Sequence, residues 1–173
     1  MAKLIHGDRV GAQGKISVGC SATIFDEATI NGGATINGGA TTEGGGGRKI
    51  LLTRRSDNGR WCLPGGRLDP GESASECCAR EVWEETGLRV EVGRLIGVYT
   101  SPHHLIEYAD GNRFQLVSFS FEAHIIGGEL GLSNETTAVG YFTLDEIAQL
   151  DLMEHHQERI VDALANHSQP LVK

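Results

Sequence analysis

The sequence predicts an α+β fold, or a three-layer arrangement of helices and sheet, and two observations lead to this prediction. The apolar patterns follow the order of several strands, one helix, more strands and then helices. The length of 173 residues suits one domain and is enough to bury a core. We therefore expect a single domain over residues 1–173, with a glycine-rich repeat insertion at about residues 28–47.

The first part of the chain predicts two core strands on either side of this insertion. Residues 16–25 (ISVGCSATIF) and 48–55 (RKILLTRR) are apolar and rich in β-branched residues, whereas residues 1–15 read as an arm or a weak edge strand. Between the two core strands, ATINGG occurs twice in succession and four glycines follow. A short repeat can indicate a β-solenoid, but so few turns with so much glycine favour a flexible or hairpin-like insertion. A role of this insertion in binding a partner stays open.

The segment that follows predicts a helix over residues 73–86. Ser73 and Glu76 have the spacing of a capping box, which satisfies the first free N–H groups of a helix. Gly87 stands where a helix commonly ends in a left-handed residue. Pro64-Gly65-Gly66, shortly before the helix, predicts a tight loop.

After this helix the sequence predicts strands and then two helices. Expected strands cover residues 89–99, 105–108, 113–124 and 139–142, and expected helices cover 144–150 and 154–165. Gly127-Gly128 should break the chain, and the tail from Asn166 should be loose. The four cysteines form no CxxC pair, so we expect neither a zinc site nor a structural disulfide.

Three carboxylates give the helix over residues 73–86 its chemistry. Glu81, Glu84 and Glu85 are three and four residues apart, which places them on one helix face within about one turn. Their mutual repulsion would weaken the helix unless a cation lies between them. Mg²⁺ or Mn²⁺ prefers such oxygen ligands and keeps waters of its own, so the sequence predicts a divalent metal site.

The same segment resembles the Nudix box. Gly66, then Glu72, then residues 80–88 (REVWEETGL) fill every required position of that motif, including the apolar ones, Val82 and Leu88. The resemblance covers about residues 16–165 apart from the insertion. It implies a Nudix-type αβα sandwich with a mixed β-sheet, and a metal-dependent hydrolase of phosphoric anhydrides.

The resemblance also implies roles for single residues. It makes Glu84 and Glu85 metal ligands and Glu81 a ligand or a water-orienting base, with the Gly65 carbonyl and Glu72 as further ligand candidates. Arg80 would then hold the glutamates in place by charge-assisted hydrogen bonds.

In some family members a later loop supplies the general base, and Glu135 lies in the corresponding region of this chain. Ala138 stands where a second acidic residue is often found, so Glu81 and Glu135 remain alternatives for the base.

Two pairs of residues are candidates for binding the substrate. Arg54 and Arg55 end a predicted strand, where alternation allows at most one of them to face the site and hold a phosphate. His103 and His104 follow Pro102 in a predicted loop that could cover a nucleotide.

The expected substrate is a nucleoside diphosphate linked to another group, with ADP-ribose or a nucleotide sugar as the leading class. A nucleoside triphosphate pyrophosphohydrolase of the housecleaning type is the alternative within the enzymes, and a nucleotide-sensing module without turnover is the alternative outside them. The net charge of −8 argues against nucleic-acid binding. No apolar run has membrane-spanning length, so we expect a cytoplasmic protein. A homodimer stays open.

Overall fold

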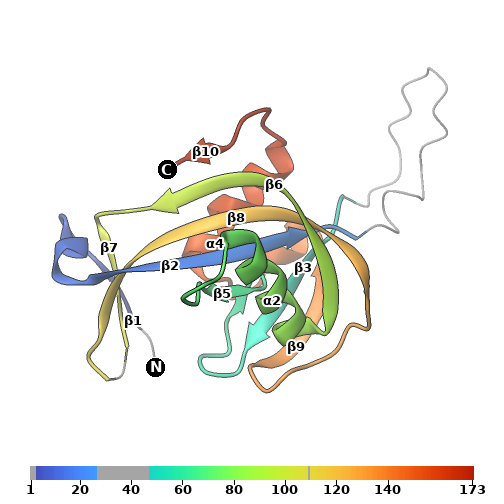
Figure 1. The fold of residues 1–173 in the computed structure, drawn as a ribbon, viewed down its shortest axis with the longest axis horizontal. Helices are drawn as coiled ribbons and strands as arrows, with labels where there is room; N and C mark the ends of the chain where they lie inside the picture. The colour runs from blue at the N-terminus through green and yellow to red at the C-terminus, as the bar shows by residue number, and fades with distance from the viewer. Residues whose placement is uncertain (1–2, 27–46, 109) are drawn as a thin grey trace.

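The computed structural model describes residues 3–26, 47–108 and 110–173, so nearly all of the predicted insertion lies outside the described residues. Figure 1 shows helix α2 in front of a large sheet and helix α4 behind it. The chain therefore has helices on both faces of its sheets, and the predicted αβα sandwich is confirmed.

The large sheet is mixed. Its strands are β1 (Lys3–His6), β2 (Lys15–Ile24), β5 (Gly65–Arg67), β6 (Leu88–Thr100), β7 (His104–Glu107), β8 (Arg113–Gly128) and β10 (Leu171–Val172). They run in the order β1-β7-β8-β2-β5, with β6 paired to β8 and β10 paired to β6. The β2–β8 and β6–β10 pairs are parallel and the other pairs are antiparallel.

A smaller antiparallel sheet connects the large one to the C-terminal helices. Its strands are β3 (Ile50–Arg55), β4 (Trp61–Cys62) and β9 (Thr136–Phe142), in the order β4-β3-β9. Alternation along β3 sends Leu51 into the core beneath α2 (Ala74–Thr86) and sends Ile50 and Leu52 into a second core with α3 (Leu144–Ile147) and α4 (Glu154–Ala165). Both faces of this short strand are therefore buried, as its apolar run predicts.

Helix α2 begins and ends as the sequence predicts. The Ser73 side chain accepts a hydrogen bond from the Glu76 backbone, and the Glu76 side chain accepts one from the Ser73 backbone. Gly87 closes the helix in the left-handed conformation, with φ of 73°. Cys77, Cys78 and Val82 are fully buried against the sheet, so the opposite face of the helix, with its glutamates, is left to line a site.

Three local predictions were wrong. Gly127 and Gly128 do not break the chain but extend β8, where they pair with Arg89 and Leu88 and adopt positive φ angles. The tail after Asn166 is not loose, because β10 adds to the edge of β6. Gly65 lies in a strand rather than in a tight loop, because the antiparallel partner β2 pairs with β5. All three misses come from partners that are distant in sequence.

A short 3-10 helix, η1 (Val10–Gln13), joins β1 to β2.

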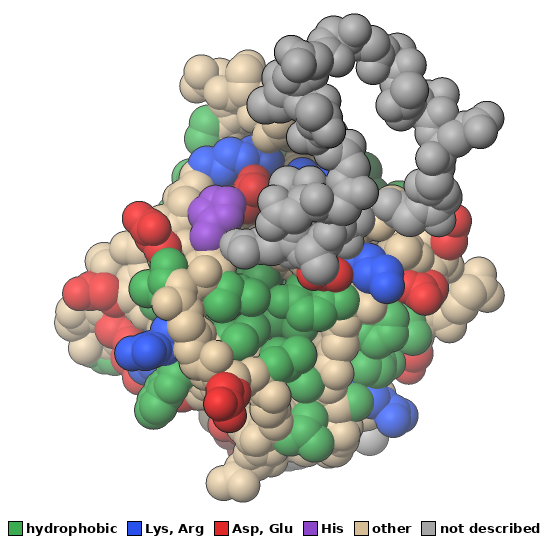
Figure 2. Space-filling model, turned by 90° about the vertical axis from the view of Figure 1, so that its right-hand side faces the viewer, with side chains coloured by type: hydrophobic (Ala, Val, Ile, Leu, Met, Phe, Trp, Pro, Cys, Tyr) green, Lys and Arg blue, Asp and Glu red, His purple; other side chains and the backbone are tan. Residues whose placement is uncertain are grey.

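Figure 2 shows the face at the right-hand side of Figure 1, where hydrophobic side chains gather in the centre and charged side chains are scattered around them. Within the described residues, no helix is both long and apolar enough to span a membrane.

Candidate active site

A cavity of about 620 Å³ lies where α2, α4, β2 and β5 meet. Gly65, Gly66, Glu81 and Glu85 line it from β5 and α2, and we call these four residues the glutamate wall. His155, His156 and Arg159 line it from α4, and we call these three residues the α4 wall. The volume lies within the usual range of small-molecule sites.

Glu85 is the most buried carboxylate of the glutamate wall, with 3% of its surface exposed. Its Oε2 atom accepts hydrogen bonds from the Gly65 backbone at 3.0 Å and from the Thr53 hydroxyl at 3.5 Å. Burial raises the pKa of Glu85 to about 7, and the negative charges of Glu81 and Glu135 act in the same direction. Glu85 therefore faces two like charges that a cation would neutralise.

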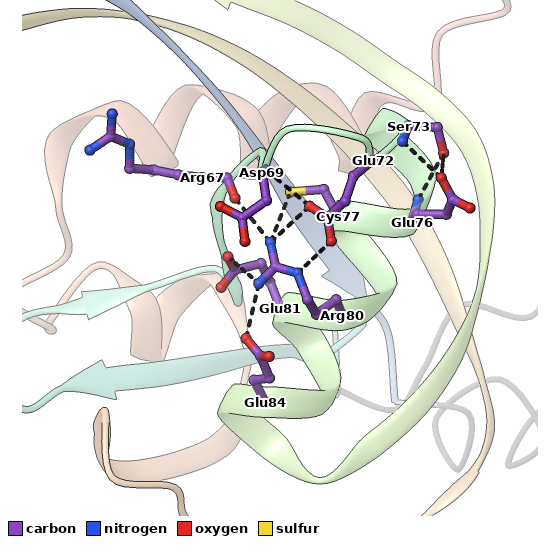
Figure 3. A network of polar contacts seen from close by, with 9 residues as sticks. All are labelled: Arg67, Asp69, Glu72, Ser73, Glu76, Cys77, Arg80, Glu81 and Glu84. Atoms are coloured by element: carbon purple, nitrogen blue, oxygen red, sulfur yellow. Dashed lines mark hydrogen bonds and ion pairs between the residues drawn. The ribbon is translucent and has the colours of Figure 1, made fainter.

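Arg80 holds the remaining glutamates of this region, as Figure 3 shows. Its Nη1 atom donates to Glu81 Oε1 and to Glu84 Oε2, both at 2.9 Å. Its Nε atom donates to Glu72 Oε1 at 2.6 Å. Hydrogen bonding to Arg80 lowers the pKa of Glu72 to about 2. The arginine thus has the positioning role that the sequence predicts for it.

The described residues contain no group of three His, Cys, Asp or Glu side chains gathered as metal ligands. The donor chemistry nevertheless fits a hard divalent cation, since carboxylate and carbonyl oxygens are the ligands that Mg²⁺ prefers. Glu81, whose pKa is raised mainly by burial, also lines the cavity beside Glu85. Both carboxylates would be stabilised in their charged form by a cation.

The two glycines of β5 allow the backbone to approach these carboxylates. A Cβ atom at Gly66 would overlap the carboxylate of Glu81, and one at Gly65 would overlap the backbone of Cys20 and Ser21. Gly65 also has a φ of 151°, which side chains rarely allow. The glycines are therefore required by the shape of the glutamate wall.

The structure brings some of the predicted site residues to the cavity and leaves others away from it. The predicted residues that line it are Gly65, Glu81, Glu85, Glu135 and Arg55, and those that do not are Glu72, Glu84, Arg54, His103 and His104. Of the two arginines that end β3, Arg55 faces the cavity and pairs with Asp57 at 2.9 Å, as alternation allows. Arg54 instead donates to the Gly59 carbonyl at 2.7 Å.

The two predicted histidines lie elsewhere. The His103 ring accepts a hydrogen bond from the Arg9 backbone at 3.1 Å. His104 lines a neighbouring cavity of about 180 Å³ and packs edge-on against His6. They stand at the turn into β7, which pairs with β1 rather than covering the glutamate wall.

The sequence interpretation missed the α4 wall. Trp61 and Met153 join β4 to the start of α4, because the Met153 backbone donates to the Trp61 carbonyl at 2.9 Å. One turn into the helix, His156 Nδ1 accepts a hydrogen bond from the Leu63 backbone at 3.3 Å. A signal was present in the spacing, since His156, Arg159 and Asp162 recur every three residues on the buried stripe of a predicted helix.

Arg60 was missed as well. It lines the cavity and donates to Asp151 at 2.9 Å and to Glu154 at 3.0 Å. These ion pairs join the β4 entry to the beginning of α4, and no local pattern links residues so far apart in the sequence.

Comparison with known proteins agrees with this architecture. The family model of the NUDIX domain matches residues 38–164. A "MutT-like protein" of Streptomyces ambofaciens is 41% identical over 116 residues, which cover 67% of this chain and 68% of that protein. An "ADP-ribose pyrophosphatase" of Methanocaldococcus jannaschii is 37% identical over 105 residues, which cover 59% of each.

A solved structure shows the same fold. The crystal structure of an ADP-ribose pyrophosphatase from Streptococcus suis superimposes with a TM-score of 0.64, at 24% identity, over 91% of this chain and 98% of that one. The fold is the αβα sandwich of that structure, and the cavity is lined by carboxylates. The chain belongs to the Nudix family, and it is a Nudix hydrolase.

Proposed function

We propose that this protein hydrolyses the diphosphate of a nucleoside diphosphate linked to another group, with ADP-ribose or a nucleotide sugar as the leading substrate. The observation that carries the proposal is the cavity of about 620 Å³, which is lined by Glu81 and Glu85 and also extends along β1 and β7. A diphosphate alone would need only the end lined by Glu81 and Glu85. The remaining volume suits the groups attached on either side of the diphosphate.

The lining of that remaining volume supports a nucleoside or sugar. Leu4, Ile106 and Leu116 provide apolar surface, and Tyr108 provides an aromatic ring. Arg67 adds a positive charge beside them, and Arg55 and Arg60 also line this volume, each in an ion pair with a carboxylate. Apolar walls with a few polar groups are typical of sites for nucleotide-sized ligands. The similarity to a relative named for ADP-ribose pyrophosphatase activity supports the same class.

In this proposal Glu81, Glu84 and Glu85 would hold Mg²⁺ or Mn²⁺, with the Gly65 carbonyl and Glu72 as further ligand candidates. When bound, the cation supplies positive charge to the phosphoryl oxygens and lowers the pKa of water. Arg80 sets the positions of Glu72, Glu81 and Glu84, which it contacts directly. The Gly65 N–H and the Thr53 hydroxyl both donate to the Glu85 carboxylate, at 3.0 and 3.5 Å, and fix its position.

Glu81 and Glu135 are the two candidates for the base that takes the proton from the attacking water. Both line the cavity, and both raise the pKa of Glu85, so both are close to the reacting space. A general base must lie within hydrogen-bond reach of the water from which it takes the proton. Glu81→Gln and Glu135→Gln separate them, since the variant that lacks the base loses kcat together with the acidic limb of its pH profile.

The test is product release from a panel of substrates with Mg²⁺ and with Mn²⁺. The panel contains ADP-ribose, nucleotide sugars, dinucleotides, and normal and oxidised nucleoside triphosphates, with Glu85→Gln as the inactive control. Preferred turnover of ADP-ribose or a nucleotide sugar supports the proposal. Preference for a triphosphate points to the housecleaning alternative, and binding without turnover of any compound points to a sensing module.

A further inference from the structure

Arg159 is a buried cation that lacks a carboxylate partner. The side chain is 4% exposed, and its Nε atom has no hydrogen-bond partner in the described part of the chain. Its Nη1 atom donates one long bond, of 3.4 Å, to the Ser21 hydroxyl. Buried guanidinium groups are normally paired, because the loss of hydration strongly disfavours an isolated charge.

The acidic residues near Arg159 are committed to other partners. Glu158 and Asp162, on the same helix, both pair with Lys173, at 3.1 and 2.9 Å. The Asp162 carboxylate also accepts a hydrogen bond from the Tyr99 hydroxyl at 2.9 Å. The centroid of the Tyr99 ring lies 5.5 Å from the guanidinium carbon, and such a cation–π contact is weaker than pairing with an anion. Burial accordingly lowers the pKa of Arg159 to about 10.

The other arginines on this side of the cavity differ from Arg159. Arg55 is paired with Asp57, and Arg60 is paired with Asp151 and Glu154. Their charges are already compensated within the protein. Among the described residues, Arg159 is therefore the cavity arginine that is buried, has no ion pair with a carboxylate and has a guanidinium atom without a hydrogen-bond partner.

The contacts of Arg159 and its helix place the residue close to the glutamate wall. Its partner Ser21 lies opposite Gly65 in the pairing of β2 with β5. His156, one helical turn earlier, contacts the Leu63 backbone on the other side of Pro64. Arg159 lines the large cavity and also the neighbouring cavity of about 180 Å³, so the exposed part of its side chain faces space that a ligand can enter.

We propose that Arg159 is an anion-binding residue that holds a phosphoryl oxygen of the substrate next to the glutamate wall. The inference rests on the proposed function for the identity of the ligand and names a residue that fixes its position. A phosphate group supplies the negative charge that the buried guanidinium lacks, and it accepts the paired hydrogen bonds that a guanidinium donates. Arg159 is then a determinant of specificity for diphosphate-containing ligands.

The experiment uses the full chain and inorganic pyrophosphate as the probe. Binding is measured by calorimetry in EDTA and again with Mg²⁺, and thermal unfolding is recorded with and without pyrophosphate. The variants are Arg159→Met, which keeps an unbranched side chain, and Arg159→Lys, which keeps the charge but not the planar donors. Arg94→Met is the matched control, because Arg94 also contacts α4, through the Ala163 carbonyl, but does not line the cavity.

We expect Arg159→Met to weaken pyrophosphate binding by at least ~10-fold, the loss of a charge-assisted contact, and Arg159→Lys to weaken it less. Without ligand, Arg159→Met should unfold at the same temperature as the unchanged protein or higher, because an uncompensated buried charge has been removed. Its unfolding temperature should no longer rise with pyrophosphate. Arg94→Met should bind as the unchanged protein does.

Two results would overturn the inference. One is a pyrophosphate affinity that is unchanged in Arg159→Met. If only the affinity for a nucleoside falls in this variant, Arg159 contacts the nucleobase and not a phosphate. The other is no pyrophosphate binding by the unchanged chain. If Arg159→Met does not fold, Arg159→Lys decides the question. Pyrophosphate binding that depends on Arg159, in a protein that hydrolyses nothing in the substrate panel, would keep this inference and reject the proposed function.

Discussion

The glutamate wall and the α4 wall face the same cavity but balance their charges in opposite ways. On the glutamate side, one guanidinium at Arg80 is shared by Glu81 of the wall and by Glu72 and Glu84 outside the cavity, so negative charge is in excess. On the α4 side, Arg159 is buried without a carboxylate, so positive charge is in excess. A cation suits the first wall and an anion suits the second, and a metal-bound diphosphate carries both. In the proposed function, the unsatisfied charges of the two walls therefore select the ligand.

The largest expected effect breaks the glutamate wall at its most buried residue. Glu85→Gln removes a negative charge that would hold the proposed cation, so kcat/KM for the preferred substrate should fall by at least ~10²-fold, as for lost electrostatic stabilisation. The free energy of unfolding should stay the same or rise, because burial already disfavours the charged form of Glu85. Enzyme kinetics and urea unfolding measure the two effects.

Glu91→Gln is the matched control, since Glu91 is exposed on β6 and does not line the cavity. A Glu85→Gln variant that loses stability together with activity would contradict this description, because it would make the carboxylate part of the folding core.

A second change displaces the glutamate wall without altering its charge. The Cβ atom of Gly66→Ala would overlap the Glu81 carboxylate and push it from its position. We expect kcat/KM to fall about 10- to 100-fold, in line with the effect of small displacements in active sites. Gly131→Ala is the control, because its nearest neighbour outside the adjacent residues would be 3.9 Å away. Equal activity in the two variants would rule out a need for close backbone approach at Gly66.

A third change tests whether Arg80 and the cation compete for the same carboxylates. Arg80→Met leaves Glu72, Glu81 and Glu84 without their shared partner, so the free energy of unfolding should fall by about 1–2 kcal/mol, the usual range for partly exposed charged hydrogen bonds. Mg²⁺ should raise the unfolding temperature of Arg80→Met more than that of the unchanged protein. Thermal unfolding across a Mg²⁺ titration measures the difference.

Arg94→Met serves as the control for Arg80→Met, because it breaks the ion pair with Glu122, away from the cavity. The idea of competition fails if Mg²⁺ stabilises Arg80→Met and the unchanged protein by the same amount.

The smallest effect concerns the α4 wall and pH. Burial lowers the pKa of His156 well below its usual value, so the folded protein keeps this ring neutral while the unfolded chain protonates it near pH 6.5. The unfolded state therefore binds more protons below that pH, and stability falls as the pH decreases. From pH 7.5 to 5.5 the contribution of His156 to the free energy of unfolding should fall by about 1.4 kcal/mol.

His156→Asn keeps an acceptor for the Leu63 backbone and removes the titrating ring. Its stability should change less between these two pH values than that of the unchanged protein, and less than that of His124→Asn, which alters an exposed histidine. The same pH dependence in all three proteins would show that His156 does not titrate in this way.

The sequence was sufficient for α2 because the signals for that helix are local. Ser73 and Glu76 lie within one turn of each other, and Gly87 directly follows the last turn. The glutamate spacing likewise places three carboxylates on one face without any tertiary information. The start of β2 and the bounds of α4 were also close to their predicted positions, since apolar periodicity over ten or more residues is a strong signal.

Where the sequence failed, the deciding contacts joined distant residues. The tail became β10 because it met the free edge of β6, and Gly128 stayed in β8 because Leu88 pairs with it. Edge pairing of this kind leaves little trace in a short segment, because its stabilisation comes from the partner strand. His103 and His104 do not line the large cavity, and their role in substrate binding stays a prediction, since a loop position in the sequence does not tell which surface the loop faces.

By itself the sequence determined the family, helix α2 and the carboxylate oxygens of the glutamate wall, because these depend on residues within one short segment. Only the tertiary structure decided which carboxylates line the cavity, that Arg55 rather than Arg54 faces it, and that Arg159 lies on its other wall. The physical reason is burial. Whether a charge is paired, exposed or isolated depends on neighbours that the fold brings together, and this sets both its pKa and the ligand it can hold.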